Sequence, residues 1–466
     1  MKHLIVLLFT FLFFSCEEKV SGDLIIRNVT TIDAQNGLVE NQTIVIRENR
    51  IDQVLTNNQV PLSDETTVID GSGQFLIPGL WDAHVHFAYI EEMAPNMFDL
   101  FLRYGVTSVR DTGGKIEFVK EWKKRADAIP DYAPRVKIAG PLIDGEPNVY
   151  DGSTPARPEL SVGNDDVEDV KRIVNQLADE GVDLLKAYEM LTPEQFIAVA
   201  NTARQRGLKV TGHVPLSMDV ISASEAGLNS MEHMRNLEMS CATNSAELLD
   251  ARRAMLAQGK GDEGGVLRSR IHLAQRQDAI ANYDETTAQK VLDVLKVNDT
   301  WQIPTLSIMT AMSKRPFANR EWQETFQYLP KGVQERWAEG VDRVLANPPS
   351  ESNEIYTQWT MHMVEKINDQ GIPIMAGTDC PIFFLTPGRS LHEELNLLVQ
   401  SGLSPLEAIA SATVRPAEYF EMDDLGLIQE GMIADLLLLK QNPLDDIKHT
   451  MSITEVIKNG KVYEAH

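Results

Sequence analysis

From about residue 160 onward the chain repeats one pattern of apolar and polar positions: an amphipathic helix, a glycine, a short apolar strand and a polar residue. Apolar residues recur at helical spacing over 167–177, and the apolar run "VDLLK" then ends at Lys186. Thr192 and Pro193 are typical of the start of the next helix, and "LKVTGH" follows it and ends at His213. Such alternation of helices and strands predicts a parallel sheet.

Other strands with polar ends fit the same scheme. "LNSMEH" ends at His233 and "IPIMAGTD" ends at Asp379. We expect the remaining strands in "GLWDAHVH", "GVTSVRD" (105–111), "RVKIAGP" (135–141) and "TWQIPTLSI" (301–309), the last of these as the seventh strand. Polar residues at the C-terminal ends of successive strands are typical of a (β/α)8 TIM barrel, whose active site lies on that face.

The two ends of the chain have a different pattern, because strand-like runs with turn signals occur before and after the barrel segment. We therefore predict a small β-sandwich domain built from both termini. Two segments within the barrel region, at about 241–300 and 310–355, are rich in helix formers and too long for simple loops, so we expect helices there. The predicted division is a signal segment at 1–16, sandwich residues 17–77, a barrel over 78–424 with insertions at about 241–300 and 310–355, and sandwich residues 425–466.

The first sixteen residues have a basic start, an apolar stretch and then Ser15 and Cys16. The stretch is too short to span a bilayer, and it reads as a secretory signal. The cysteine at its end resembles the lipobox of bacterial lipoproteins, although Phe13 and Phe14 depart from the usual residues. This resemblance implies a lipid anchor at Cys16 and an exported, membrane-anchored lipoprotein on the periplasmic or outer-surface side of a Gram-negative bacterium. A simple secreted protein is the alternative.

The formal net charge of −25 argues against nucleic acid as a partner, because phosphates would be repelled over most of the surface. Only Cys241 and Cys380 remain after the predicted signal, and the sequence leaves open whether they pair. It also leaves open whether the chain acts alone or as a homo-oligomer.

Residues 79–89 place His84 and His86 on either side of one valine. In a strand both imidazoles point to the same face, where they could bind one metal ion. A pair of structural or surface histidines would have the same spacing. The metal interpretation gains weight from the polar residues that end the other predicted strands, which are Lys186, His213, His233 and Asp379.

Taken with the segments "GVTSVRDTGG", "LLKAY", "TGHVP", "SMEH", "AGTD" and "LGLIQEGMIADLLLLK", this set resembles the amidohydrolase superfamily, in particular its binuclear branch with a carboxylated lysine. The resemblance covers nearly the whole chain after the signal. It implies two divalent metal ions, one held by His84, His86 and Asp379 and the second by His213 and His233.

By the same resemblance Lys186, carboxylated by CO2, would bridge the two ions. An unmodified ammonium could not lie between two cations, and burial would favour the neutral amine that reacts with CO2. A hydroxide shared by the ions would attack an amide carbonyl, with Asp379 as the catalytic residue that moves the proton. Zinc suits these ligands, although manganese remains an alternative. Asp82 either orients one of the histidines or is structural.

"GVTSVRDTGG", "KAY" and "LHEELNLLVQSGLSPLEAI" resemble the group of metal-dependent prolidases and Xaa-amino acid dipeptidases. The expected substrate is therefore a small dipeptide or N-acyl amino acid. Tyr188 could contact it, or could be a core tyrosine, and Arg235 is a weaker candidate for binding a substrate carboxylate. Arg110 and Asp111 more simply hold strand ends together.

Two alternatives stay open. One is a cyclic-amide hydrolase or a deaminase-like activity related to imidazolonepropionase. Deaminases of the superfamily carry a glutamate soon after the histidine of the fifth strand, but "HVPLSMD" has none, and they usually lack the bridging lysine that Lys186 would provide. The other alternative, from a different class of protein, is a barrel that has lost catalysis and serves as a binding lipoprotein.

Overall fold

The computed structural model describes residues 22–56 and 67–464. The predicted signal segment and Cys16 lie outside these residues. Among the residues that are described, no helix combines the length and the apolar character that crossing a bilayer requires.

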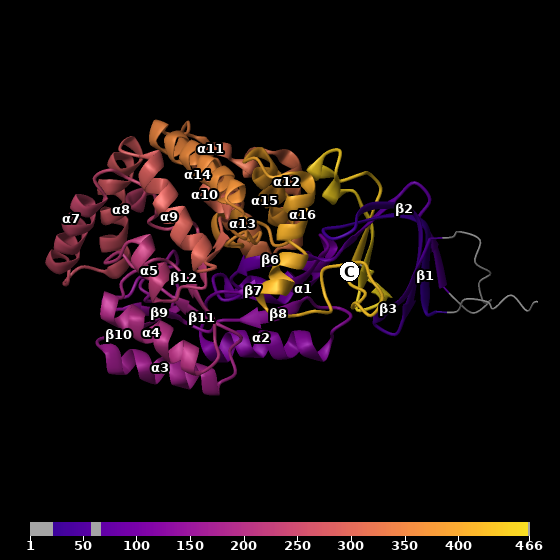
Figure 1. Cartoon of the computed structure of the whole chain (residues 1–466), viewed down its shortest axis with the longest axis horizontal. Coiled ribbons are helices and arrows are strands. Elements are labelled where there is room, and N and C mark those ends of the chain that lie inside the picture. The colour runs from indigo at the N-terminus through magenta and orange to yellow at the C-terminus, as the bar shows by residue number, and fades with distance from the viewer. Residues whose placement is uncertain (1–21, 57–66, 465–466) are drawn as a thin grey trace, which may run out of the picture.

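Strands from both ends of the chain share one eight-stranded sheet, in the order β17-β16-β15-β5-β1-β2-β3, with β4 paired to β1. It lies at one end of the molecule (Figure 1). The strands are β1 (Leu24–Asp33), β2 (Gly37–Arg47), β3 (Arg50–Leu55), β4 (Thr67–Asp70), β5 (Phe75–Pro78), β15 (Leu436–Leu439), β16 (Ile453–Lys458) and β17 (Lys461–Val462).

Both ends of the chain contribute strands to this small β domain, and these strands form one hydrogen-bonded network. The long strand β1 connects its parts. The first half of β1 pairs with β4 and the second half with β5. β15 then pairs antiparallel with β5 and connects the C-terminal strands. The sheet has its own apolar core, which includes Ile26, Ile44, Leu436 and Leu438.

The middle of the chain has an α/β fold with parallel strands in two sheets, β6-β7-β8 and β10-β9-β11-β12-β13-β14. These strands are β6 (Leu80–Val85), β7 (Val106–Asp111), β8 (Arg135–Ile138), β9 (Leu142–Gly145), β10 (Ser161–Asn164), β11 (Leu185–Ala187), β12 (Val210–Gly212), β13 (Ser230–Glu232) and β14 (Trp301–Ile303). Single contacts link the sheets further: Asp183 N–H donates to the Ile138 carbonyl at 2.9 Å, and parallel bridges join Val85 to Cys380 and Gln302 to Ile374.

Helices surround the parallel strands, and the helices of the first insertion project at the end opposite the terminal sheet (Figure 1). The longer helices are α1 (Ala94–Arg103), α2 (Ile116–Ala128), α3 (Val167–Asp179), α4 (Pro193–Gln205), α7 (Ser245–Gln258), α8 (Gly264–Ala281), α9 (Glu285–Val297), α13 (Lys331–Leu345), α14 (Glu351–Asp369) and α15 (Arg389–Gln400). The short ones are α5 (Val220–Ala226), α6 (Leu237–Ser240), α10 (Leu306–Met309), α11 (Ala311–Lys314), α12 (Arg320–Glu324), α16 (Pro405–Ser411) and α17 (Val414–Tyr419).

The predicted start of α4 is confirmed. The Thr192 side chain accepts from the Gln195 N–H and the Gln195 side chain reaches back to the Thr192 N–H, which forms a capping box ahead of Pro193.

The predicted seventh strand is too long. β14 ends at Ile303, and Leu306–Met309 forms α10 instead. Pro304 has no N–H with which to extend a ladder. The buried Glu394 carboxylate then accepts from the N–H groups of Leu306 and Ser307 at 2.8 and 2.6 Å, which stabilises a helix start rather than a strand.

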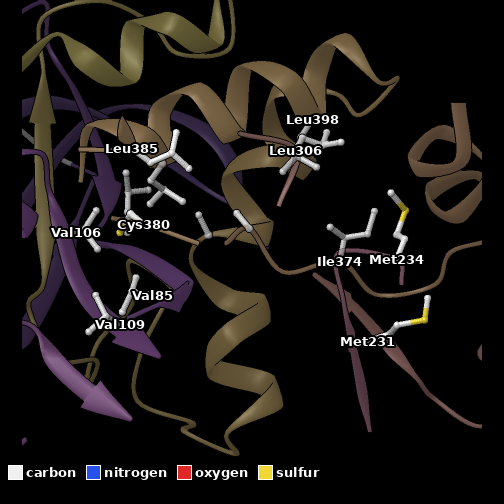
Figure 2. Packing of buried hydrophobic residues seen from close by; sticks show 14 of the residues in the cluster. Val85, Val106, Val109, Met231, Met234, Leu306, Ile374, Cys380, Leu385 and Leu398 are labelled. Atoms are coloured by element: carbon white, nitrogen blue, oxygen red, sulfur yellow. The ribbon is translucent and has the colours of Figure 1, made fainter. Parts of the chain in front are cut away.

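The apolar side of β6 faces away from the histidines. Val85 is fully buried, and Figure 2 shows it close to Val109 and Cys380 in the main apolar core. Cys241 and Cys380 are both buried free cysteines, so they do not form a disulfide with each other.

A buried ion cluster joins the terminal sheet to the parallel strands. Asp435, next to β15, accepts from the Arg135 guanidinium of β8, from Lys458 Nζ at 3.2 Å and from the Asn459 N–H at 2.7 Å. Burial raises the pKa of Asp435, but Lys458 and Arg135 outweigh this and lower it below the usual value. The carboxylate is therefore charged in the folded protein near neutral pH.

We predict that Asp435→Ala lowers the free energy of unfolding by about 3–5 kcal/mol, because it leaves buried Lys458 and the Arg135 guanidinium without their partner. Denaturant unfolding measures the change. In the wild type this contribution is present above about pH 4 and is lost as the pH falls through the depressed pKa of the folded protein. Glu324→Ala, which breaks an exposed pair with Arg320, serves as the control and should cost no more than about 1 kcal/mol. Equal losses in the two variants would contradict the prediction.

Candidate metal centre

A small cavity of about 30 Å³ lies at the C-terminal ends of the parallel strands. All six predicted metal-site residues line it, together with the two predicted substrate residues Tyr188 and Arg235. The remaining lining residues are Leu142, Tyr150, Leu160, Arg268 and Ile382. Strands far apart in the sequence thus deliver the predicted set to one place.

Three electron-pair donors meet at the centre of this cavity. The Nε2 atoms of His84 and His86 are 3.3 Å apart, and they lie 3.2 and 3.0 Å from Oδ1 of Asp379. His233 Nε2 lies 3.8 Å from Oδ2 of the same carboxylate. His213 is next to His233, with ring centroids 4.8 Å apart.

The opposite nitrogen of the His84 and His86 rings is held by an acceptor. His84 Nδ1 contacts the fully buried Glu232 carboxylate, and His86 Nδ1 donates to the carbonyl of Gly113 at 3.3 Å. A carbonyl can only accept, so the proton of neutral His86 is on Nδ1. Arg110 Nη2 donates to Glu232 at 2.8 Å and lowers the pKa of that carboxyl well below its usual range, against the effect of burial.

The other two histidines are oriented in the same way. His213 Nδ1 donates to Glu189 at 2.6 Å. His233 Nδ1 lies 2.6 Å from the Thr305 hydroxyl, whose own proton goes to the Pro304 carbonyl at 2.7 Å. The hydroxyl oxygen therefore accepts from His233. Burial lowers the pKa of both rings well below the usual value, so both are neutral near pH 7.

When the proton of a neutral ring is held on Nδ1 in this way, its Nε2 carries a lone pair. Oδ1 of Asp379 faces two of these nitrogens at hydrogen-bond distance. Asp379 Oδ1 is buried and has no hydrogen-bond partner among the described residues. Burial raises the pKa of Asp379, yet His84 and His233 lower it well below the usual range, so it is ionised. Three converging lone pairs repel one another unless a cation lies between them. The ligand atoms of His84, His233 and Asp379 also lie within 4.8 Å of one another. The donor set therefore fits a divalent metal ion.

Lys186 completes the set from β11. Its ammonium is buried and lies 3.9 Å from Oε1 of Glu232. Burial lowers the pKa of Lys186 to about 8, although Glu232 and Asp379 act in the opposite direction. A substantial fraction of the amine is therefore neutral in mildly alkaline solution.

The backbone is strained at two of these positions. His233 and Asp379 have φ angles of 57° and 68°, which non-glycine residues rarely adopt and which cost on the order of 1–3 kcal/mol each. Gly377 permits the close approach of the Asp379 segment to β6, since a Cβ there would lie 2.8 Å from the Cβ of His84. The site is thus held in place at the expense of local stability.

The structure assigns Asp82 to packing rather than to imidazole orientation. Its carboxylate accepts from the N–H groups of His84 and Thr378 and from the Thr378 hydroxyl, so it attaches the last parallel segment to β6. Arg110 donates to the Ala83 carbonyl and Asp111 accepts from the N–H of Phe87, in keeping with the expected role in holding strand ends.

Sequence reasoning missed the groups that orient the rings, Glu232, Glu189 and Thr305, as well as the cavity residue Arg268. Glu232 precedes His233 and Glu189 follows Tyr188 directly, so the carboxylates next to predicted site residues were an available signal. Thr305 and Arg268 had no such neighbour.

The family assignment follows from a comparison with protein families, in which the amidohydrolase family model matches residues 75–262 and 342–463. The chain belongs to the amidohydrolase family. The family resemblance drawn from the sequence is thereby confirmed.

Individual relatives are more distant. Ochratoxinase from Aspergillus niger is 37% identical over 100 residues, which is 20% of this chain and 20% of that protein. Adenine deaminase from Listeria innocua is 22% identical over 461 residues, 95% of this chain and 58% of the relative. The chain therefore matches well under two thirds of the length of either relative.

Solved structures share the fold across nearly the whole chain. A Xaa-Pro dipeptidase with bound methionine has a TM-score of 0.67 at 20% identity and covers 95% of this chain and 99% of its own. The structure of A. niger ochratoxinase has a TM-score of 0.64 at 20% identity, with coverages of 95% and 96%.

We predict that Thr305→Val weakens metal binding by about 10–100-fold, because His233 loses the acceptor that fixes its tautomer. Competition with a chelating dye measures the affinity. Thr310→Val is the matched control, since the Thr310 hydroxyl is also buried but donates only to the Leu306 carbonyl. Unchanged affinity in the Thr305 variant would show that the contact does not orient a ligand.

Proposed function

We propose that the protein is a metal-dependent hydrolase that cleaves the amide bond of small dipeptides or N-acyl amino acids. The observation that carries this proposal is the convergence of His84, His86 and Asp379 on one point, with His213, His233 and Lys186 lining the same cavity. Family membership supports it, and so do the names of the fold relatives, a Xaa-Pro dipeptidase and ochratoxinase.

We also propose that the parallel segments close into a (β/α)8 barrel. Support comes from the single contacts between the sheets: β8 is joined to the segment before β11, and residues 374–380 bridge to β14 on one side and to β6 on the other. A barrel places all six metal-site residues on one rim.

In this proposal His84, His86 and Asp379 hold one divalent ion, His213 and His233 hold a second, and a carboxylated Lys186 connects them. Zinc is the metal that best suits histidine and carboxylate ligands. Ions bound there would polarise the scissile carbonyl and acidify water. The burial of Lys186 supports the lysine assignment, because burial lowers the pKa of the amine to about 8 and so favours the neutral form that reacts with CO2.

Asp379 has two separate tasks in the proposed reaction. Oδ1 lies between His84 and His86 and serves as a ligand. Oδ2 remains available to accept a proton from the attacking water and to donate it to the leaving nitrogen. The depressed pKa of Asp379 keeps the carboxylate ionised at neutral pH, as a proton acceptor must be.

The surrounding side chains exclude bulk water and orient the substrate. The ring of Tyr188 packs against His213 with centroids 4.3 Å apart, and the apolar Leu142, Leu160 and Ile382 line the cavity. Low polarity strengthens electrostatic interaction with the developing charge on the carbonyl oxygen. In this proposal Tyr188 and Arg235, which line the cavity, contact the substrate.

A deaminase-like or cyclic-amide activity is the second candidate, favoured by the match to adenine deaminase over 95% of the chain. One screen separates the two. Metal-reconstituted protein is assayed with dipeptides, N-acyl amino acids, lactams and aminated heterocycles. We expect hydrolysis of the first two classes, its loss after chelation and its recovery when zinc is restored.

Asp379→Asn should keep the fold but lose most of the rate in the same assay, since an amide cannot move the proton. Elemental analysis and circular dichroism of this variant separate a loss of chemistry from a loss of metal or fold. Activity confined to lactams or heterocycles would overturn the dipeptidase assignment, and absence of all activity would favour the non-catalytic binding lipoprotein.

We infer that a lipid on Cys16 anchors the protein on the periplasmic or outer-surface side of the membrane. The sequence alone supports this inference, through the apolar run that ends in "FFSC". Cys16→Ser should move the protein from the membrane to the soluble fraction, because attachment would depend on acyl chains. Retention on the membrane after salt washing of this variant would contradict the anchor.

A further inference from the structure

Helix α8 brings a guanidinium into the cavity from outside the part of the chain that the family model matches. That match stops at residue 262 and resumes at 342, whereas α8 begins at Gly264. Arg268 on this helix lines the same cavity as the metal-site residues, and its side chain is only 18% exposed. The inserted helix thus contributes to the proposed active site itself.

Close packing fixes the helix in this position. A Cβ on Gly264 would lie 2.2 Å from the Pro147 carbonyl oxygen, so the start of α8 lies directly on the loop that carries Tyr150. Leu267 and Ile271 of α8 are fully buried in an apolar cluster with Tyr188. Arg268 is therefore held over the cavity by its neighbours in the helix.

One buried carboxylate organises the charged groups here. Glu189 is completely buried and accepts from His213 Nδ1 at 2.6 Å and from His272 Nε2 at 2.7 Å. It also forms ion pairs with Arg268 at 3.1 Å and with Arg235 at 3.8 Å.

This arrangement leaves one positive charge without a partner. Two guanidinium groups face the single negative charge of Glu189. Within the described part of the chain neither arginine forms an ion pair with any other carboxylate, and neither Nε makes a hydrogen bond.

We propose that Arg268, together with Arg235, binds the α-carboxylate of the substrate, and that Glu189 positions both guanidinium groups. An anionic group that enters the cavity supplies the missing negative charge and accepts charge-assisted hydrogen bonds in a water-poor site. The inference rests on the proposed function and narrows it: the substrate carries a free carboxylate on the residue next to the scissile amide. The inserted helix, not the shared barrel, supplies this selectivity.

The test compares one substrate in two forms: the best dipeptide from the screen and the same dipeptide with a C-terminal amide. Each is assayed with metal-reconstituted wild type, Arg268→Gln and Arg268→Lys. We expect Arg268→Gln to lower kcat/KM for the acid by about 100-fold, mainly through KM, and to change the amide by less than about 3-fold. Arg268→Lys should be intermediate, because it keeps the charge but loses the planar fork.

Arg270→Gln is the matched control. It removes the same charge from the same helix, but Arg270 is half-exposed and pairs with Asp262 at 2.6 Å, outside the cavity. This variant should keep the acid-to-amide ratio of the wild type. Added guanidinium ion should partly restore hydrolysis of the acid by an Arg268→Ala variant and leave hydrolysis of the amide unchanged.

A second measurement does not depend on turnover. Calorimetry with the free amino acid released from the same dipeptide should show binding to wild type and Arg270→Gln and little binding to Arg268→Gln, at equal metal content. An equal loss for acid and amide, or a loss of metal from Arg268→Gln, would assign Arg268 to structure and overturn the subsite. Carboxylate binding through Arg268 in a protein that hydrolyses no amide would instead overturn the proposed function alone.

Discussion

The site depends on one constraint: each imidazole must expose an unprotonated Nε2 to the same small space. A carboxylate, a backbone carbonyl, a second carboxylate and a hydroxyl hold the Nδ1 protons of the four rings. If any of these acceptors were replaced by a donor, the neutral ring would carry its proton on Nε2 instead of Nδ1. That N–H would point to the centre of the cavity and exclude a cation. The identity of the acceptors therefore matters as much as that of the ligands.

Glu232 shows how this constraint extends into the framework. Its carboxylate contacts His84 of β6, Arg110 of β7 and the Thr211 hydroxyl of β12. One buried charge thus connects three parallel strands beneath the cavity, and Arg110 compensates it. A buried pair of this kind contributes little net stability but strongly penalises arrangements that separate its members. We infer that it fixes the relative positions of the strands more than it strengthens the fold.

The sequence was sufficient for the alternation of helices and strands, the shared face of His84 and His86, and the polar residues at the strand ends. These features are local, because periodicity and turn residues encode them over a few positions. The partners of the ligands could not be found in this way. His84 and Glu232 are 148 residues apart, and Asp82 and Thr378 are 296 apart, so only the three-dimensional arrangement of the strands brings them together. The role of Thr305 could not be predicted either. It depends on the end of β14 at Ile303, before Pro304, whereas residues 301–309 were expected to form one continuous strand.

The terminal sheet combines strands from both ends of the chain, and this has a consequence for synthesis on the ribosome. β5 pairs with β15, so the strands made first meet their neighbour only after more than three hundred further residues have been translated. Until then the edge of β5 that pairs with β15 carries free N–H and C=O groups beside apolar side chains. Such an edge can pair with strands of other nascent chains. Completion of this sheet thus waits for the synthesis of β15, β16 and β17. A chain that stops before β15 would retain the metal-site residues but lack the strands that cover the edge of β5.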